Sequence, residues 1–197
     1  MGYDLLAAFF FVLIAPFVLA GFAAFWFVNA RDHEELARSW ASYARARDLH
    51  FVPLQGDWPN RTAVLMTWAS GDATLRLTTV GREAKVRTRL VVRPRATLLG
   101  SLVWICDAGA AARIRTAERP VGFTERVVSE RVRRALLALR QRDRVTLSYR
   151  RGRIVVEWPG GELNDARLDA ARQLGDVLAE SIDASFRTPA LIRKPAA

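Results

Sequence analysis

The residue types that most often carry catalysis or bind metals are sparse in this chain. Its two histidines, His33 and His50, are too far apart in sequence for the short spacings of a metal-binding motif. The single cysteine, Cys106, ends an apolar segment, where a buried and unreactive thiol is expected. Glu34 and Glu35 are adjacent, so on a helix their carboxylates point apart. We therefore expect no catalytic residue, metal or cofactor, and keep an enzyme of unknown class as an alternative.

The charge pattern is most regular in the strand-like segment Ala84–Arg93. Lys85, Arg87 and Arg89 share one face because side chains on a strand repeat every two residues, and Arg76 is expected across from them on the neighbouring strand. This candidate electrostatic face is either a solvated surface or a site that attracts anionic lipid or an acidic partner, at about 1 kcal/mol per basic residue near a membrane. The core side is predicted to hold Val86, Leu90 and Val92.

The wider composition limits the partners and the compartment. The chain has a formal net charge of +10, from 30 basic and 20 acidic residues, but the excess of arginine alone says little about binding. Nucleic acid is the less favoured partner, because the tryptophans do not interleave with the basic run as stacking platforms would. With one cysteine the chain has no internal disulfide, which fits a reducing cytoplasm.

Hydrophobic periodicity predicts one α+β domain after residue 30. Asp32 and Glu35 have the spacing of an N-terminal capping pair, so the helix with Trp40 and Tyr43 in its apolar stripe either starts there or runs on from the preceding segment. A period of two then indicates a mostly antiparallel sheet, with an antiparallel meander up to Ala84–Arg93. The segment ending at Cys106 is predicted to be a central, buried strand, and the last segment a short edge strand. The predicted strands are Phe51–Leu54, Arg61–Ala69, Ala73–Val80, Ala84–Arg93, Thr97–Cys106 and Ala111–Thr116.

The C-terminal part adds two helices and a hairpin, giving about three helices in all. Ser129 is a good N-cap for a helix that ends near Arg142. The strands Arg144–Tyr149 and Arg153–Trp158 are predicted to pair as a hairpin. Asn164 or Asp165 caps the last helix. Its apolar face is predicted to hold Leu168, Ala171, Leu174, Leu178 and Ile182.

The segment Leu5–Ala30 contains no charged residue and is predicted to be a single transmembrane helix. At 1.5 Å per residue it is about 39 Å long, enough to span a hydrocarbon core of about 30 Å. A cleaved signal peptide is the alternative, but the N-terminus lacks basic residues and the apolar segment is too long. Within it, Ala20, Gly21 and Ala24 form a candidate helix-packing seam.

Basic residues follow the apolar segment and none precedes it, which predicts a cytoplasmic C-terminal domain. The flanking basic residues are Arg31, Arg38, Arg45 and Arg47.

A local resemblance supports the same organisation. Phe123, the segment Val128–Leu139 and the hairpin Val145–Trp158 resemble a family of uncharacterised bacterial membrane-anchored proteins, over about residues 122–182. The resemblance implies an anchored α+β module in a bacterial inner membrane and supplies no activity.

The sequence therefore predicts three parts: an anchor at residues 1–30, a domain at residues 31–186 and a flexible tail at residues 187–197. We expect a non-enzymatic, single-pass accessory or scaffold protein that contacts membrane lipid and a membrane-protein partner or a second copy of itself. An electrostatic binding module for anionic lipid or nucleic acid is the alternative.

Overall fold

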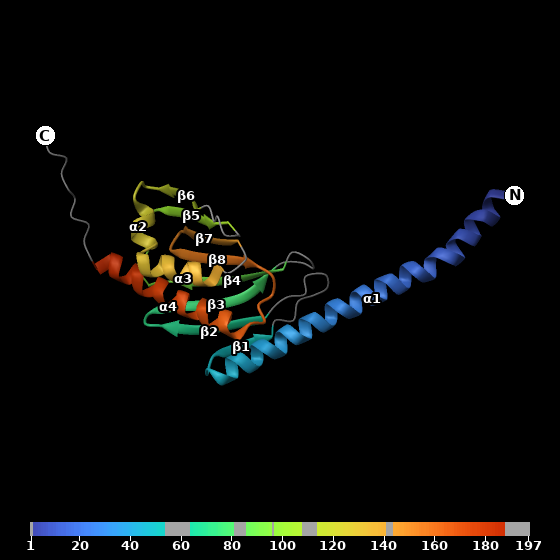
Figure 1. The fold of residues 1–197 in the computed structure, drawn as a ribbon, viewed down its shortest axis with the longest axis horizontal. Coiled ribbons are helices and arrows are strands. Elements are labelled where there is room, and N and C mark those ends of the chain that lie inside the picture. Colours follow the sequence, from blue (N-terminus) through green and yellow to red (C-terminus); the bar gives the residue numbers. More distant parts are fainter. Residues whose placement is uncertain are drawn as a thin grey trace.

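The computed structural model describes residues 2–53, 64–80, 86–95, 97–107, 114–140 and 144–187. Within these residues the chain forms helices and strands in the mixed order of an α+β fold, as predicted (Figure 1). The helices are α1 (Gly2–Ala46), α2 (Phe123–Val127), α3 (Glu130–Arg140) and α4 (Asp165–Arg187). The strands are β1 (His50–Pro53), β2 (Val64–Ser70), β3 (Ala73–Val80), β4 (Arg87–Arg93), β5 (Ser101–Cys106), β6 (Ile114–Arg119), β7 (Val145–Arg150) and β8 (Arg153–Pro159).

All these strands join one antiparallel sheet in the order β1-β2-β3-β4-β8-β7-β5-β6. The first four form the predicted meander, and the predicted C-terminal hairpin is present as β7 and β8. The hairpin lies between the meander and β5, because β8 pairs with β4 and β7 pairs with β5. Strands that are distant in sequence are therefore neighbours in the middle of the sheet.

Helices α2, α3 and α4 lie together on one face of this sheet (Figure 1). The strand side chains that face them are apolar and form a single buried core with the inner faces of the helices. Leu90 and Val92 of β4 are fully buried, as the alternation predicted, whereas Val86 is half-buried. Leu168, Leu174 and the other residues of the predicted face of α4 are also buried.

Helix α1 runs without a break from Gly2 to Ala46, so it continues past Asp32 rather than starting there. Trp40 and Tyr43 are buried against the domain, as predicted. Trp40 Nε1 donates a 2.6 Å hydrogen bond to the Glu162 carbonyl, and the Tyr43 hydroxyl donates a 2.7 Å bond to Asp169. In the part of the chain that the structure describes, no helix has both the length and the hydropathy of a membrane span.

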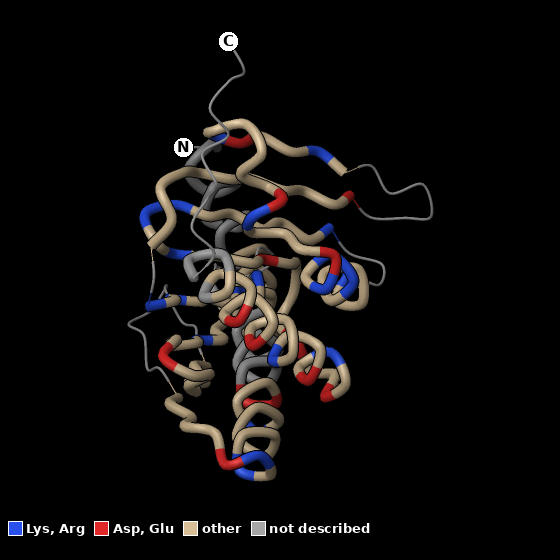
Figure 2. Tube along the Cα trace, turned by 90° about the vertical axis from the view of Figure 1, so that its left-hand side faces the viewer, with Lys and Arg blue, Asp and Glu red and all other residues tan. Residues whose placement is uncertain are grey.

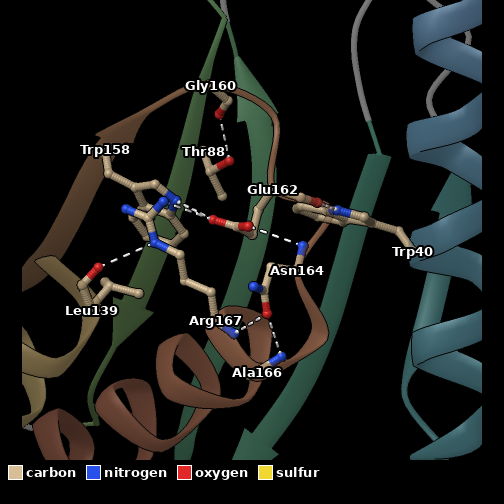
Figure 3. Close-up of polar contacts among 9 residues, drawn as sticks. All are labelled: Trp40, Thr88, Leu139, Trp158, Gly160, Glu162, Asn164, Ala166 and Arg167. Carbon is tan, nitrogen blue, oxygen red and sulfur yellow. Dashed lines mark hydrogen bonds and ion pairs between the residues drawn. The ribbon is translucent and has the colours of Figure 1, made fainter. Parts of the chain in front are cut away.

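A buried polar network joins α1, α4 and the end of β8 (Figure 3). The Arg167 guanidinium lies 3.2 Å from the Glu162 carboxylate, and their side chains are only 9% and 8% exposed. Trp158 Nε1 and the Asn164 backbone N–H donate further hydrogen bonds to the same carboxylate, at 3.2 and 3.0 Å. Arg167 Nε donates to the Leu139 carbonyl at 3.2 Å. This network satisfies a buried charge with partners from three segments.

Two predictions about the sheet require correction. The segment ending at Cys106 is not a central strand buried on both sides: β5 lies next to the edge, and Val103 is 40% exposed. Its apolar sequence reflects a core on one face and an uncovered apolar surface on the other. The predicted last strand is an edge, but it spans Ile114–Arg119. Helix α2 was not expected, and the predicted tail lies outside the described residues from 188 onward.

Candidate binding surface

The sheet face opposite α2, α3 and α4 is called the open face here, because no described helix packs on it. Its side chains form rows that cross the strands, since antiparallel register places paired residues on the same face. We call the strand ends nearest the N-terminal half of α1 proximal and the opposite ends distal; in Figure 1 these are the right-hand and left-hand ends. The open face has a distal, a middle and a proximal row.

The distal row consists of arginines. Arg150 of β7 pairs directly with Arg153 of β8, and Ser101 of β5 pairs with both Arg150 and Arg119. Arg93 follows Val92, which pairs with Ile154, so Arg93 lies beside the strand position of Arg153. All the arginine side chains of this row are exposed. Figure 2 looks onto this end, where Lys and Arg positions in blue recur along the sheet.

The turn between β7 and β8 brings two of these arginines together. Arg151 and Gly152 both have positive φ, 51° and 70°, as in the two-residue type I′ turn that suits a hairpin. A Cβ on Gly152 would come within 2.6 Å of the Thr97 hydroxyl oxygen, which adds a steric reason for glycine. A two-residue turn places the flanking residues opposite each other, so Arg150 and Arg153 have their charges side by side.

Carboxylates do not neutralise the distal row within the described residues. Asp72, at the same end of the sheet, is 2.8 Å from Arg95. Glu118 of β6 points to the helix side, where it accepts hydrogen bonds from Thr124 and from the Gly122 backbone N–H. The Thr124 hydroxyl and these backbone groups hold the pKa of Glu118 below its usual value. The row therefore carries an uncompensated positive charge.

The middle row is apolar or small. Val91 of β4 pairs with Val155 of β8, which pairs with Ser148 of β7. The row continues through Val103 and Ala117 on β5 and β6. Val91 is buried among its neighbours and Val103 is 40% exposed. A strip of apolar and small side chains, with the hydroxyl of Ser148 at its centre, therefore runs beside the arginine row across five strands; it is called the apolar strip below.

Two of the predicted basic residues, Arg87 and Arg89, lie at the proximal end of β4, and the structure adds an acid to them. Glu157 of β8 pairs in register with Arg89 of β4 and forms an ion pair with its guanidinium. Arg87 lies 3.8 Å from the same carboxylate. An open hollow of about 460 Å³ lies here, and Arg87, Arg144, Thr146 and Glu157 are among the residues that line it. The proximal end is thus a mixed charge cluster rather than a purely basic face.

The other predicted site residues have separate positions. Arg76 is exposed on the same face as Arg87 and Arg89, but its cross-strand partner is Val91 rather than one of the basic residues that it was expected to face. Lys85 lies outside the described residues. Ala20, Gly21 and Ala24 are exposed on α1, and nothing lies within 4 Å of a Cβ built on Gly21. The predicted seam is therefore uncovered in a single chain.

The described His, Cys and Glu residues that were considered for catalysis or metal binding do not lie together in one site. Cys106 is fully buried, with its sulfur 3.6 Å from an Arg140 nitrogen, and His50 is exposed at the start of β1. Glu35 is exposed on α1, and the side chain of His33 lies outside the described part. Across the described residues, no three His, Cys, Asp or Glu side chains could hold one metal ion.

Comparison of the chain with family models, with curated proteins and with solved structures finds no match in any of the three. The open face therefore has to be interpreted from its own chemistry.

Sequence reasoning missed the distal row, although one signal for it was present. The predicted hairpin already contained Arg150, Arg151 and Gly152 at its turn, and alternation would have placed Arg150 and Arg153 on one face. Arg93 and Arg119 could not be added, because the pairing of β8 with β4 and of β5 with β7 joins segments that are distant in the chain.

Proposed function

We propose that this chain is a non-enzymatic, single-pass membrane protein whose α+β domain binds a protein partner through the open face. The observation that carries the proposal is an uncovered face on a broad sheet, with an apolar strip bordered by arginines. Protein interfaces have this anatomy, with an apolar centre, a charged rim and an enrichment of arginine. Exposed apolar surface of this kind marks an interaction site.

The membrane anchor in this proposal rests on the uncharged segment Leu5–Ala30 and on its exposed side chains. Phe17, Leu19 and Phe22 are 74%, 68% and 70% exposed on α1. Such apolar side chains gain free energy when lipid or another helix covers them. The basic residues Arg31, Arg38, Arg45 and Arg47, which follow this segment, support a cytoplasmic domain.

A position-specific crosslinking experiment tests the proposal. A photo-reactive amino acid replaces Val103 on the open face or Leu137 on α3, and both native side chains are 40% exposed. In native cells we expect a discrete protein adduct from position 103 and none from position 137, with the chain retained in membranes after an alkaline wash. Equal adducts from both positions would remove the open face as the contact. Release by the wash would remove the anchor.

Anionic lipid is a second candidate, favoured by the position of the hollow. Arg87 and Arg144 line it at the proximal end, from which the N-terminal half of α1 projects (Figure 1). If α1 enters a membrane, these guanidinium groups are the ones closest to its headgroups. Glu157 shares the hollow and is paired with Arg89, which lowers its net charge and ranks this candidate second.

A further inference from the structure

We infer that the partner contributes an acidic, amphipathic protein segment, which binds along the distal arginine row with its apolar side on the middle row. This inference rests on the proposed function, because it assigns a chemistry to the protein partner proposed above. The row is formed by Arg93, Arg119, Arg150 and Arg153.

The first argument is the arrangement of charge. Arg150 and Arg153 are a directly opposed cross-strand pair, and like charges in that position destabilise a sheet. Glu157, by contrast, pairs with Arg89 at the proximal end and lies 3.8 Å from Arg87, so the arginines there have a carboxylate beside them. The distal row has no such acid among the described residues. Guanidinium groups bind carboxylates in a bidentate geometry, so an acidic segment supplies the missing partners.

The second argument is size. From β4 through β8, β7 and β5 to β6 the row crosses four strand spacings of about 4.8 Å each, or about 19 Å. A helix rises 1.5 Å per residue, so about three to four turns cover that distance. A short amphipathic segment can therefore place acids along the whole row and apolar side chains along the adjacent strip.

The third argument separates protein from nucleic acid. Single-stranded nucleic acid is held by aromatic side chains that stack on its bases, beside positive charge. The aromatic residues of the described strands face the helix side, so the open face lacks such platforms within the described residues. These aromatic residues are Phe51, Trp68, Trp104, Tyr149 and Trp158.

The fourth argument concerns distance from a membrane. The distal row lies at the end of the sheet opposite to the end from which the N-terminal half of α1 projects (Figure 1). Strand β4 has 7 residues, so its ends are about 20 Å apart. The Debye length at physiological salt is about 8 Å, so the headgroups that surround the anchor act weakly on this row.

A binding experiment with the full chain in a non-ionic detergent tests the inference. The probe is a fluorescent 16-residue peptide whose helix has glutamate on one face and leucine on the other, and its matched control has glutamine in place of glutamate. Variant R150Q/R153Q removes charge from the row. Variant R133Q/R134Q removes the same charge from the exposed side of α3 and is the control protein.

We expect the glutamate peptide to bind and the glutamine peptide not to bind. R150Q/R153Q should weaken binding about tenfold or more, since the loss of even one charge-assisted contact is worth about a factor of ten, whereas R133Q/R134Q should change it less than twofold. Thermal melting of both variants checks that the fold is intact. Equal weakening by the two variants, or no binding of the glutamate peptide, would overturn the inference.

Two further probes decide between classes of partner. A 15-nucleotide single-stranded RNA and vesicles with anionic lipid are measured in the same competition. Stronger binding of either one, lost in R150Q/R153Q, would overturn the inference in favour of that ligand. An adduct at position 103 in cells together with failure of the peptide would leave the proposed function standing and remove only the acidic partner.

Discussion

Two arginine environments in this protein differ in almost every respect. Arg167 is 9% exposed, is paired with Glu162 at 3.2 Å and has its guanidinium 5.8 Å from the centre of the Trp158 ring. Arg150 and Arg153 are exposed and face each other across a hairpin. A buried charge is tolerated only when it is paired, so Arg167 serves the fold. An exposed pair of like charges does not stabilise the fold, so we assign Arg150 and Arg153 to the binding of a ligand.

Breaking the buried pair should have the largest effect on stability. E162Q leaves the Arg167 guanidinium buried without an opposing charge, and we expect it to lower the free energy of unfolding by about 3–5 kcal/mol. Urea denaturation followed by circular dichroism measures the change. Because replacing both partners of a buried pair is often nearly neutral, E162Q/R167M should recover part of the loss. A loss below about 1 kcal/mol in E162Q would show that the Glu162–Arg167 pair is not needed for the stability of the fold.

The ion pair of Arg47, just after α1, with Asp169 of α4 should have an intermediate effect on stability, and this effect should depend on pH. Arg47 donates two hydrogen bonds to Asp169, at 2.8 and 2.7 Å, and holds the pKa of that carboxyl below its usual value. The folded state therefore binds this proton less readily than the unfolded state, so the contribution is present at neutral pH and is lost as the pH falls through the lowered pKa.

We expect D169N to cost about 1 kcal/mol at pH 7, since the carboxylate is 48% exposed, and to cost less at low pH. Thermal melting at pH 3 and pH 7 measures both values. A cost that does not change with pH would assign the effect to packing rather than to charge.

The proximal ion pair should have a smaller effect. E157Q removes the charge that faces Arg87 and Arg89, whose side chains are 62% and 36% exposed. Exposed pairs contribute about 0–1 kcal/mol, so the loss of stability should lie in that range and should shrink in high salt. A loss comparable to that of E162Q would mean that the open face is covered in solution.

The distal row should have the smallest effect on stability. R150Q/R153Q removes a like-charge pair from an exposed surface, so the free energy of unfolding should change by at most about 0.5 kcal/mol, or rise slightly. The same urea measurement checks this. Marked destabilisation would show that these arginines have structural partners and, like Arg167, stabilise the fold.

Local pattern predicted the elements that depend on local chemistry. The alternation of Arg87 and Arg89 with Leu90 and Val92 correctly placed the charges outside and the apolar side chains inside. The Ser129 side chain accepts a hydrogen bond from the Val132 backbone N–H, as expected of a cap. These features depend on residues within one turn or one hairpin.

The order of the strands could not be predicted, and the binding surface depends on it. The sequence of β4 does not indicate that β8, rather than another strand, will pair with it, because every apolar strand offers the same backbone hydrogen bonds. The salt bridge of Glu157 with Arg89 and the neighbourhood of Arg93 and Arg153 both follow from that one pairing. Glu162 and Arg167 were missed for the same reason, since their burial needs α1, β8 and α4 together.

Because α1 is one continuous helix, its length determines how the domain is rotated about the helix axis. The helix has no break between Gly2 and the residues Trp40 and Tyr43 that fix it to the domain, so the domain turns with the helix as one body. Inserting one residue after Asn29 would swing the open face by about 100° around the helix axis, whereas inserting seven would return it to within about 20° and move it about 10 Å further along. The number of residues in this helix thus sets the direction in which the arginine row faces, and a partner fixed beside the helix would bind only when that direction is right.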